Sequence, residues 1–212
     1  MFAETSNPAI HPELRPAGLL AAYAAGAFPM PDPDRPDRMM WFSPDPRGVM
    51  PLDGRFHVPR RLRRTIRQGR FECTADVAFD AVMRLCAEGR TEGTWITPDV
   101  QAAYGRLHAL GFAHSVETWP AGQAGQSEPV GGVYGLALGG AFFAESMFHR
   151  VTDAGKVALA ALVRRLGRRG FSLCDVQWLT PHLARFGAYE VPRMDYLAML
   201  TAALARQARF AD

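Results

Sequence analysis

Prolines gather in one short stretch of the chain and limit what that stretch can form. Six of the 16 prolines lie between Phe28 and Pro46. A proline lacks the backbone N–H donor and restricts both its own backbone and that of the preceding residue. The stretch is therefore predicted to hold no regular structure and to mark a boundary. We expect a small N-terminal domain over residues 1–45 and a larger domain over residues 46–212.

Capping residues and hydrophobic periodicity predict the elements on either side of this stretch. The clearest helix signal is Thr97–Gly111, because Thr97 suits the N-cap, Pro98 the first turn and Gly111 the residue after the end. Other helices are predicted over Gly18–Gly26, Pro59–Gln68, Ala78–Ala87, Gly155–Arg169 and Met194–Arg209. Strands are predicted over Ala113–Trp119, Val130–Leu138, Ala141–Phe148 and Phe171–Val176, with a hairpin turn at Gly139 and Gly140. Helices packed on a mostly antiparallel sheet would make an α+β fold.

The composition favours an ordinary soluble globular protein of the cytoplasm. Hydrophobic residues make up 48% and charged residues 21%, which allows a sizeable core. The three cysteines, Cys73, Cys86 and Cys174, form no close pair, so we expect a reducing compartment and no disulfide framework. Residues 1–14 lack the pattern of a signal peptide, and no run of about 18 apolar residues predicts a membrane helix. We also expect a monomer.

The basic residues are almost all arginines, and three of them share one predicted helix face. Only Lys156 among the 24 basic residues is a lysine. Arg60, Arg64 and Arg67 have the spacing i, i+4, i+7, which places them on one side of a helix. Three like charges held together favour a phosphate backbone as their counterion. A solvated basic face explains the same spacing equally well, so both interpretations stay open.

A carboxyl group is expected inside the sheet. Alternation in the second hairpin strand puts Glu145 on the same face as Phe143 and Met147. A buried carboxylate is costly unless it is paired or hydrogen-bonded. A core salt bridge to Arg150 or Lys156 is the structural alternative. We favour a functional role, because the strand itself offers no partner.

Two polar side chains end another buried strand. In "LCDVQWL", Asp175 and Gln177 alternate to the same side, away from Cys174 and Val176. Polar groups at the end of a strand often line a site. A cap of the strand end is an almost equally good interpretation.

Other chemistries fit the sequence less well. The segment "GGVYGLALGG" matches neither the dinucleotide fingerprint nor the P-loop, and the six histidines show no metal-ligand spacing, so we expect no metal site. A hydrolase triad of Ser146, His149 and Asp175 can be composed on paper. However, Ser146 does not lie in Gly-x-Ser-x-Gly, and His149 is too close in sequence to reach back along an extended strand.

Eight segments together resemble one known family. In chain order, from about residue 20 to residue 200, they are "GAFPM", "WFSPDPRGVMPL", "FHVPRRLRRTIR", "GTWIT", "AYGRLHALGFAHSVETW", "VGGVYGLALGGAFFAESMFHR", "LCDVQWLTPHLARFGAYEVPR" and "DYL". Through them the chain is identified as a member of the leucyl/phenylalanyl-tRNA–protein transferases. These bacterial N-end rule enzymes tag proteins that bear N-terminal Arg or Lys for degradation.

The resemblance implies a fold, a reaction and its partners. The fold is a small N-terminal domain plus a larger domain similar to the GNAT acetyltransferases. The reaction moves Leu or Phe, with Met as a further candidate, from aminoacyl-tRNA to the α-amine of an acceptor protein. No metal, nucleotide or coenzyme is required.

Catalytic roles are implied for Asp175, Gln177 and Glu145, which match the family's site positions. An α-amine has a pKa near 7.7–8.0, so part of it is already nucleophilic near pH 7, and orientation can supply most of the rate. Gln177 is therefore expected to position the amine. Asp175 would polarise Gln177 or accept charge from the developing ammonium, and Glu145 would orient the amine or the aminoacyl group.

Binding roles follow from the same resemblance. Trp95 falls where the terminal nucleotide of tRNA binds, which suits an aromatic stacking platform. Arg60, Arg64 and Arg67 fall on the cluster that holds the acceptor stem. The pocket for the amino-acid side chain is implied to consist of Val133, Met147, Leu159, Leu162, Leu166 and Cys174.

The sequence departs from the family pattern in places, and two rival functions remain. Met30 stands where an aromatic residue is often found, and Leu162 and Leu166 stand where relatives often carry aromatic rings, which bears on donor preference. The part ahead of the first helix is also shorter. An acyl-coenzyme A acetyltransferase on the same fold would need the pyrophosphate-binding motif Arg/Gln-x-x-Gly-x-Gly/Ala at a helix start, and "RRLGRRG" has Arg169 where that motif needs a small residue. A tRNA-binding module without turnover would leave the carboxyl groups unexplained.

Overall fold

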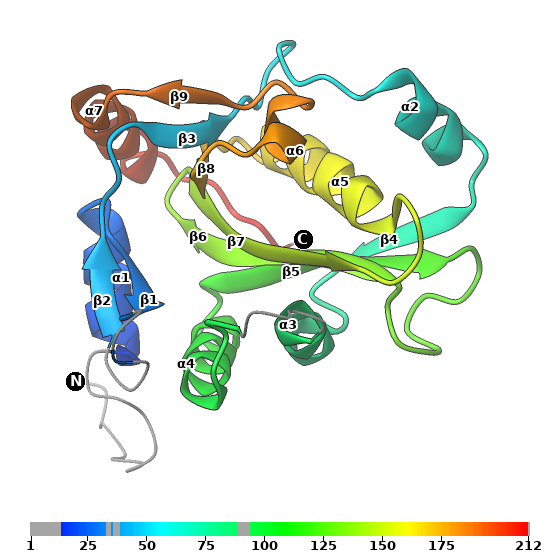
Figure 1. Ribbon diagram of the computed structural model, residues 1–212, viewed down its shortest axis with the longest axis horizontal. Helices are drawn as coiled ribbons and strands as arrows, with labels where there is room; N and C mark the ends of the chain where they lie inside the picture. Colours follow the sequence, from blue (N-terminus) through cyan, green and yellow to red (C-terminus); the bar gives the residue numbers. More distant parts are fainter. Residues whose placement is uncertain (1–13, 33–34, 36–38, 89–93, 212) are drawn as a thin grey trace.

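The computed structural model describes residues 14–32, 35, 39–88 and 94–211. A seven-stranded sheet is its largest feature (Figure 1). The strands lie in the order β4, β5, β6, β7, β8, β3, β9. Their bounds are β3 Arg47–Met50, β4 Phe71–Ala75, β5 Ala113–Pro120, β6 Gly131–Leu138, β7 Ala141–His149, β8 Leu173–Gln177 and β9 Tyr189–Val191. Within the described residues β7 and β8 pair in parallel and the other neighbours pair antiparallel. The sheet is therefore mixed and mostly antiparallel.

Helices cover both faces of this sheet and enclose two hydrophobic cores. A parallel pair needs a crossover connection, which α5 (Ala154–Arg168) provides between β7 and β8. Helix α5 lies on one face, whereas α3 (Phe79–Ala87) and α4 (Pro98–Ala109) lie on the other (Figure 1). The other helices are α1 Pro16–Ala24, α2 Arg60–Arg67, α6 Pro181–Ala184 and α7 Arg193–Leu204. No helix in these ranges is both long and apolar enough to cross a membrane.

The proline-rich stretch corrects our expectation of no regular structure. Strands β1 (Phe28–Pro31) and β2 (Met39–Phe42) form a separate two-stranded antiparallel sheet. Proline is tolerated in an edge strand, where its absent N–H is not needed, and each strand of a two-stranded sheet is an edge. Helix α1 and this sheet form a small N-terminal part ahead of the larger one. The boundary at residue 45 stays a prediction.

The periodic elements are confirmed, and the short ones were not foreseen. Helices α1 to α5 begin and end within two residues of the predicted bounds, and the Thr97 side chain caps α4 by accepting from the Val100 N–H. The last helix ends at Leu204 rather than Arg209, because the following chain turns back to stack Phe210 on Phe142. Strands β3, β4 and β9 and helix α6 were not predicted. Residues 1–13 lie outside the described residues, so the expectation that they hold no signal peptide stays a prediction. Gly93 of "GTWIT" also lies outside the described residues.

A β-bulge corrects the predicted faces of β7. Tyr134 pairs with Ser146 and Gly135 with Ala144, so Glu145 is the extra residue. A Cβ on Gly135 would lie 2.2 Å from the Phe143 carbonyl oxygen, so only glycine fits opposite the bulge. Beyond the bulge the alternation reverses: Met147 joins the core under α5, and Phe148 joins the core on the other face. Bulges re-aim side chains next to active sites, and this one carries the candidate carboxyl group.

Candidate active site

A cavity of about 430 Å³ lies where the N-terminal part meets β7, β8 and α5. Its wall is mostly apolar, and two polar side chains proposed for catalysis, Glu145 and Gln177, open into it. The lining residues are Phe28, Pro29, Met30, Trp95, Val133, Ala144, Glu145, Ser146, Met147, Leu159, Val176, Gln177, Trp178, Thr180, His182 and Leu183. An apolar cavity with a few convergent polar groups is typical of a small-molecule or substrate site.

Glu145 is held by hydroxyl and amide groups rather than by a cation. Its Oε1 accepts from the Tyr23 hydroxyl at 2.7 Å and from Gln177 Nε2 at 3.4 Å. The Tyr104 hydroxyl is bonded to that of Tyr23. Burial, reinforced by the charge of Asp175, raises the pKa of Glu145 to about 8. The carboxyl group can therefore take up or release a proton near neutral pH.

The salt bridge considered for Glu145 is not formed. Arg150 pairs with Glu88 and Glu128, and Lys156 pairs with Asp153 at 2.8 Å.

Asp175 lies behind the cavity wall, completely buried. Arg47 Nε and Nη2 donate to its Oδ1 and Oδ2 at 2.9 and 2.6 Å. The Tyr196 hydroxyl donates to Oδ2 at 2.7 Å, and the backbone N–H of Gln177 donates to Oδ1 at 2.9 Å. A carboxylate has about four acceptor positions, so these bonds occupy it fully. Asp175 therefore has no oxygen to offer to a substrate.

Arg47 links this carboxylate to the N-terminal part. Its Nη1 donates to the Gly26 carbonyl at 3.0 Å, and its guanidinium lies over the rings of Phe28 and Tyr196 at 4.8 and 4.5 Å. Burial opposes the charge of Arg47, but its bonds to the Asp175 carboxylate outweigh this effect, and the pKa of Arg47 lies above its ordinary value. Phe28 also lines the cavity, so Arg47 joins one wall of the cavity to the strand that carries Gln177.

Gln177 has an unusual backbone at the end of β8. Its φ is 59°, in the left-handed region that non-glycine residues rarely adopt. Such a conformation costs on the order of 1–3 kcal/mol and persists where its surroundings hold it in place. Here the holding contact is the bond from its own N–H to Asp175. Strain retained beside a cavity points to a functional position.

The predicted side-chain pocket is divided by the structure. Val133, Met147 and Leu159 line the cavity. Leu162, Leu166 and Cys174 do not line it. They are fully buried in the hydrophobic core under α5. Burial raises the pKa of the Cys174 thiol, which suits a packing role.

The predicted tRNA contacts occupy two different places. Trp95 lies in the cavity wall together with Met30, the residue that stands where an aromatic is often found. Arg60, Arg64 and Arg67 are exposed on α2, whose buried residues are Leu62 and Thr65.

Four residues of the hydrogen-bonded network around Glu145 and Asp175 were missed from the sequence: Arg47, Tyr23, Tyr104 and Tyr196. An arginine directly before the apolar strand segment "GVM" was the available signal, since a buried cation needs a carboxylate partner. The three tyrosines gave none, because each stands among apolar helix residues that periodicity assigns to the core.

One histidine cluster was also not foreseen. Asp76, His108 and His114 bring one possible ligand atom each within 4.8 Å of one another. Nδ1 of His108 is bonded to the Ala113 carbonyl, and His114 bridges Asp76 and the Gly111 carbonyl. These bonds account for the cluster as a tie between β5 and the turn before α3.

The alternatives weighed from the sequence lose support. His149 is exposed, whereas Asp175 is buried against Arg47 and Tyr196, so no Ser146–His149–Asp175 triad forms. The segment "RRLGRRG" lies at the C-terminal end of α5, whereas pyrophosphate binds at helix N-termini.

Comparison with known proteins identifies a transferase. The family model described as leucyl/phenylalanyl-tRNA protein transferase matches residues 49–201, and the model of its N-terminal domain matches residues 12–45. The chain belongs to the leucyl/phenylalanyl-tRNA–protein transferase family.

Several relatives carry the name leucyl/phenylalanyl-tRNA–protein transferase. That of Akkermansia muciniphila is 47% identical and covers 95% of this chain and 100% of its own length. Those of Herpetosiphon aurantiacus and Nitratidesulfovibrio vulgaris are 49% and 51% identical, covering 93% and 91% of this chain and 98% and 80% of their own. A solved structure of L-PGS from Bacillus licheniformis covers 77% of this chain and 66% of its own at 10% identity, with a TM-score of 0.47.

Proposed function

We propose that the chain transfers Leu or Phe, with Met as a further candidate, from aminoacyl-tRNA to the α-amine of proteins with N-terminal Arg or Lys, tagging them for degradation. Its relatives are named for this transfer of Leu and Phe. The observation that carries the proposal is the cavity, in which a titratable carboxyl group and a strained glutamine share a mostly apolar wall. Arg or Lys as the acceptor residue rests on the family resemblance.

The cavity has a suitable region for each part of an aminoacyl ester. The apolar side chains of Val133, Met147 and Leu159 suit an aliphatic or aromatic donor residue. Trp95 suits stacking of the terminal base of the tRNA. The ester would then lie beside Glu145 and Gln177, where the acceptor amine has to arrive.

Glu145 is the group suited to moving the proton. In the reaction the amine nitrogen bonds to the ester carbonyl carbon and the bond from that carbon to the ribose oxygen breaks. One proton leaves the nitrogen and one reaches the ribose oxygen. A pKa of about 8 is close to that of an α-amine, and general acid–base transfer is most effective between matched groups. Glu145 can accept the first proton and return one to the leaving oxygen.

Asp175 and Arg47 act as positioning residues in this proposal. The four bonds to Asp175 fix the Gln177 backbone in its left-handed conformation. The Gln177 side chain, which donates to Glu145, then presents its amide carbonyl to the amine. This role replaces the direct acceptance of charge expected for Asp175.

The fold, the location and the oligomeric state belong to the same proposal. The parallel β7–β8 pair with its α5 crossover supports a GNAT-like larger domain over residues 46–212. Free cysteines and a tRNA substrate support a cytoplasmic location, and the monomeric state stays a prediction.

The test is a transfer assay with labelled Leu-tRNA and a peptide that begins with Arg. Label should appear in the peptide, and not in the same peptide with an acetylated N-terminus. Binding of tRNA without labelled peptide would favour the binding-module alternative. Label from acetyl-coenzyme A would favour the acetyltransferase.

A further inference from the structure

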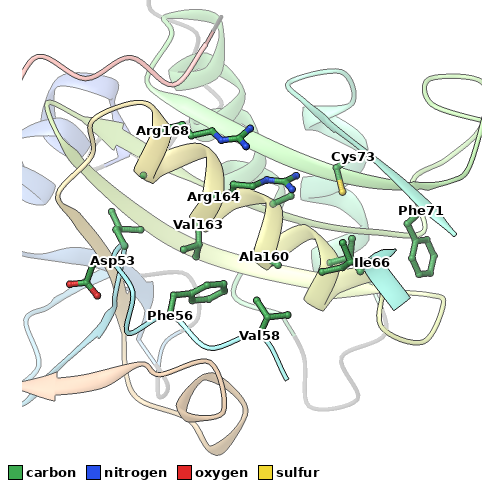
Figure 2. A pocket seen from close by; sticks show the side chains of 14 residues that line it. Asp53, Phe56, Val58, Ile66, Phe71, Cys73, Ala160, Val163, Arg164 and Arg168 are labelled. Carbon is green, nitrogen blue, oxygen red and sulfur yellow. The ribbon is translucent and has the colours of Figure 1, made fainter. Parts of the chain in front are cut away.

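A second hollow, larger than the cavity, lies between α2 and α5. It has a volume of about 560 Å³, and we call it the α2–α5 groove. Phe56, Val58, Ile66 and Phe71 give it an apolar floor, and α5 forms one side (Figure 2). An adjoining hollow of about 450 Å³ shares Cys73, Ala161, Arg164 and Arg168 with it. The two hollows therefore form one continuous surface along α5.

Arginines from the end of α5 line this surface. Arg164 and Arg168 extend from successive turns of α5 on the side of Cys73 (Figure 2), and both are exposed. Arg165 and Arg169 line the adjoining hollow. The acidic residue among the lining residues of the two hollows is Asp53, which is paired with Arg55 at 2.8 Å. The surface is thus strongly positive.

Stabilisation of the helix does not account for this arrangement. Cations in the last turn of a helix gain about 0.3–1 kcal/mol from its dipole, but like charges at i, i+4 lose a similar amount. Helix α2, with exposed Arg60, Arg64 and Arg67, packs beside α5 through a 3.3 Å bond from Thr65 Oγ1 to Asp153. Ile66 of α2 lines the groove. Arg60, Arg64 and Arg67 are not among the lining residues, so the positive charge that faces the groove comes from the end of α5.

We propose that the α2–α5 groove holds the sugar–phosphate backbone of the donor tRNA, with Arg164 and Arg168 contacting its phosphates. The inference rests on the proposed function. Arginine forks suit phosphate, and the apolar floor suits ribose and base faces. An acceptor peptide with a basic N-terminus would be repelled here. Leu159 of the cavity lies five and nine residues before these arginines, about 8 and 14 Å along the helix and on its opposite side, so the bound tRNA would pass across α5 between the cavity and the groove.

The test measures tRNA affinity against salt concentration for the wild type and for Arg164→Ala/Arg168→Ala. Each phosphate contact contributes about 0.9 to the slope of log affinity against log salt, so the double variant should lose between one and two units. We expect roughly tenfold weaker binding, equal for Leu-tRNA and Phe-tRNA, with an unchanged rate at saturating tRNA. Arg164→Lys/Arg168→Lys, which keeps the charges, should retain most of the slope. Arg106→Ala on α4, on the other face of the sheet, is the matched control.

Several outcomes would overturn the proposal. One is a double variant with the affinity and slope of Arg106→Ala. Another is a change confined to the KM for the peptide, which would make the groove a peptide site. A third is weaker binding with unchanged slope and a lower unfolding temperature without tRNA, which would make the arginines structural. Labelled peptide from the wild type beside any of these results would leave the proposed transfer intact. Absence of transfer by the wild type would instead count against the proposed function.

Discussion

The carboxyl groups of Asp175 and Glu145 belong to one buried network but have different partners. Asp175 accepts two bonds from a guanidinium, whereas Glu145 accepts from a phenol and an amide. Pairs of carboxyl groups in unlike environments commonly divide the structural and the acid–base work of a site. In the proposed function the pair Arg47–Asp175 would supply a fixed charge arrangement, and Glu145 would move the proton.

Removing Asp175 and removing Arg47 should shift the pH dependence of transfer in opposite directions. The groups that face Glu145 are the Tyr23 and Tyr104 phenols and the Gln177 amide, and the nearby charges are those of Arg47 and Asp175. Asp175→Asn leaves the cation unopposed, which favours ionised Glu145 and lowers its pKa. Arg47→Met leaves the anion unopposed and raises it.

We expect the acidic limb of the pH–rate profile to move by about one unit, downward for Asp175→Asn and upward for Arg47→Met. Each variant buries an unpaired charge and should lose roughly 3–5 kcal/mol of stability. The double variant should return the limb towards its wild-type position. Shifts of the same sign in both single variants would contradict the electrostatic role.

Glu145 should also make folding less favourable as the pH rises. Its pKa in the folded protein, about 8, lies above the ordinary value of 4.5 for a glutamate side chain. A raised pKa gives full stability below the unfolded value, and that stability is lost as pH rises through the folded value. The loss between about pH 4.5 and 8 should be on the order of 3–5 kcal/mol.

Glu145→Gln should remove most of this pH dependence and raise the unfolding free energy at pH 8. Its transfer rate should fall about 10²-fold or more, as for loss of a general acid–base group. Denaturant unfolding at several pH values, with Glu190→Gln as an exposed control, checks this. A variant with the slope of the wild type would place the titrating group elsewhere.

At the scale of elements, the sequence predicted the helices, caps and turns whose signal lies within a few neighbouring residues. The Thr97 cap, the Gly139–Gly140 turn and the amphipathic α5 each carry their signal within a few residues. Strands β3 and β9 carry too few residues for a periodic pattern, and β1 and β2 combine prolines with strand pairing.

The residues of the candidate site likewise divide into those that the sequence indicated and those that only the fold brings together. Asp175, Gln177 and Glu145 stand out as polar residues in apolar strands, so the sequence indicated them. Arg47 meets Asp175 across 128 positions, and only the β3–β8 pairing brings them together. The β7 bulge depends on the glycine opposite it in β6, so alternation along one strand could not predict it.

Helix α5 allows packing to be separated from donor selection. Leu159 lines the cavity, whereas Leu162 lies in the core and is completely buried. Leu159→Ala should enlarge the cavity and raise the preference for Phe-tRNA over Leu-tRNA by about tenfold. Leu162→Ala should cost about 2–5 kcal/mol of stability with little change in that preference. Competition between Leu-tRNA and Phe-tRNA measures the preference of each variant, and thermal unfolding measures its stability. Equal shifts in preference for the two variants would contradict the placement of Leu159 in the cavity and of Leu162 in the core.

At the scale of the whole molecule, the N-terminal part and the larger part share one core. Leu19 and Tyr23 of α1 belong to the same cluster as Phe143 of β7 and Tyr196 of α7. The N-terminal part also supplies Phe28 to the cavity and the Tyr23 hydroxyl to Glu145. The site is therefore complete only when both parts are packed together.

This shared core leads us to expect a single cooperative unfolding transition for the chain. Domains with separate cores can unfold separately, whereas parts that bury apolar surface against each other lose it together. Leu19→Ala removes a completely buried side chain of α1 and should lower the whole transition by about 2–5 kcal/mol without splitting it. Calorimetry of the wild type and of Leu19→Ala, with transfer activity measured across the same temperatures, tests this. Activity should be lost with the one transition in both proteins. An earlier, separate transition that abolishes transfer would show that the N-terminal part unfolds by itself and that the shared core does not couple it to the larger part.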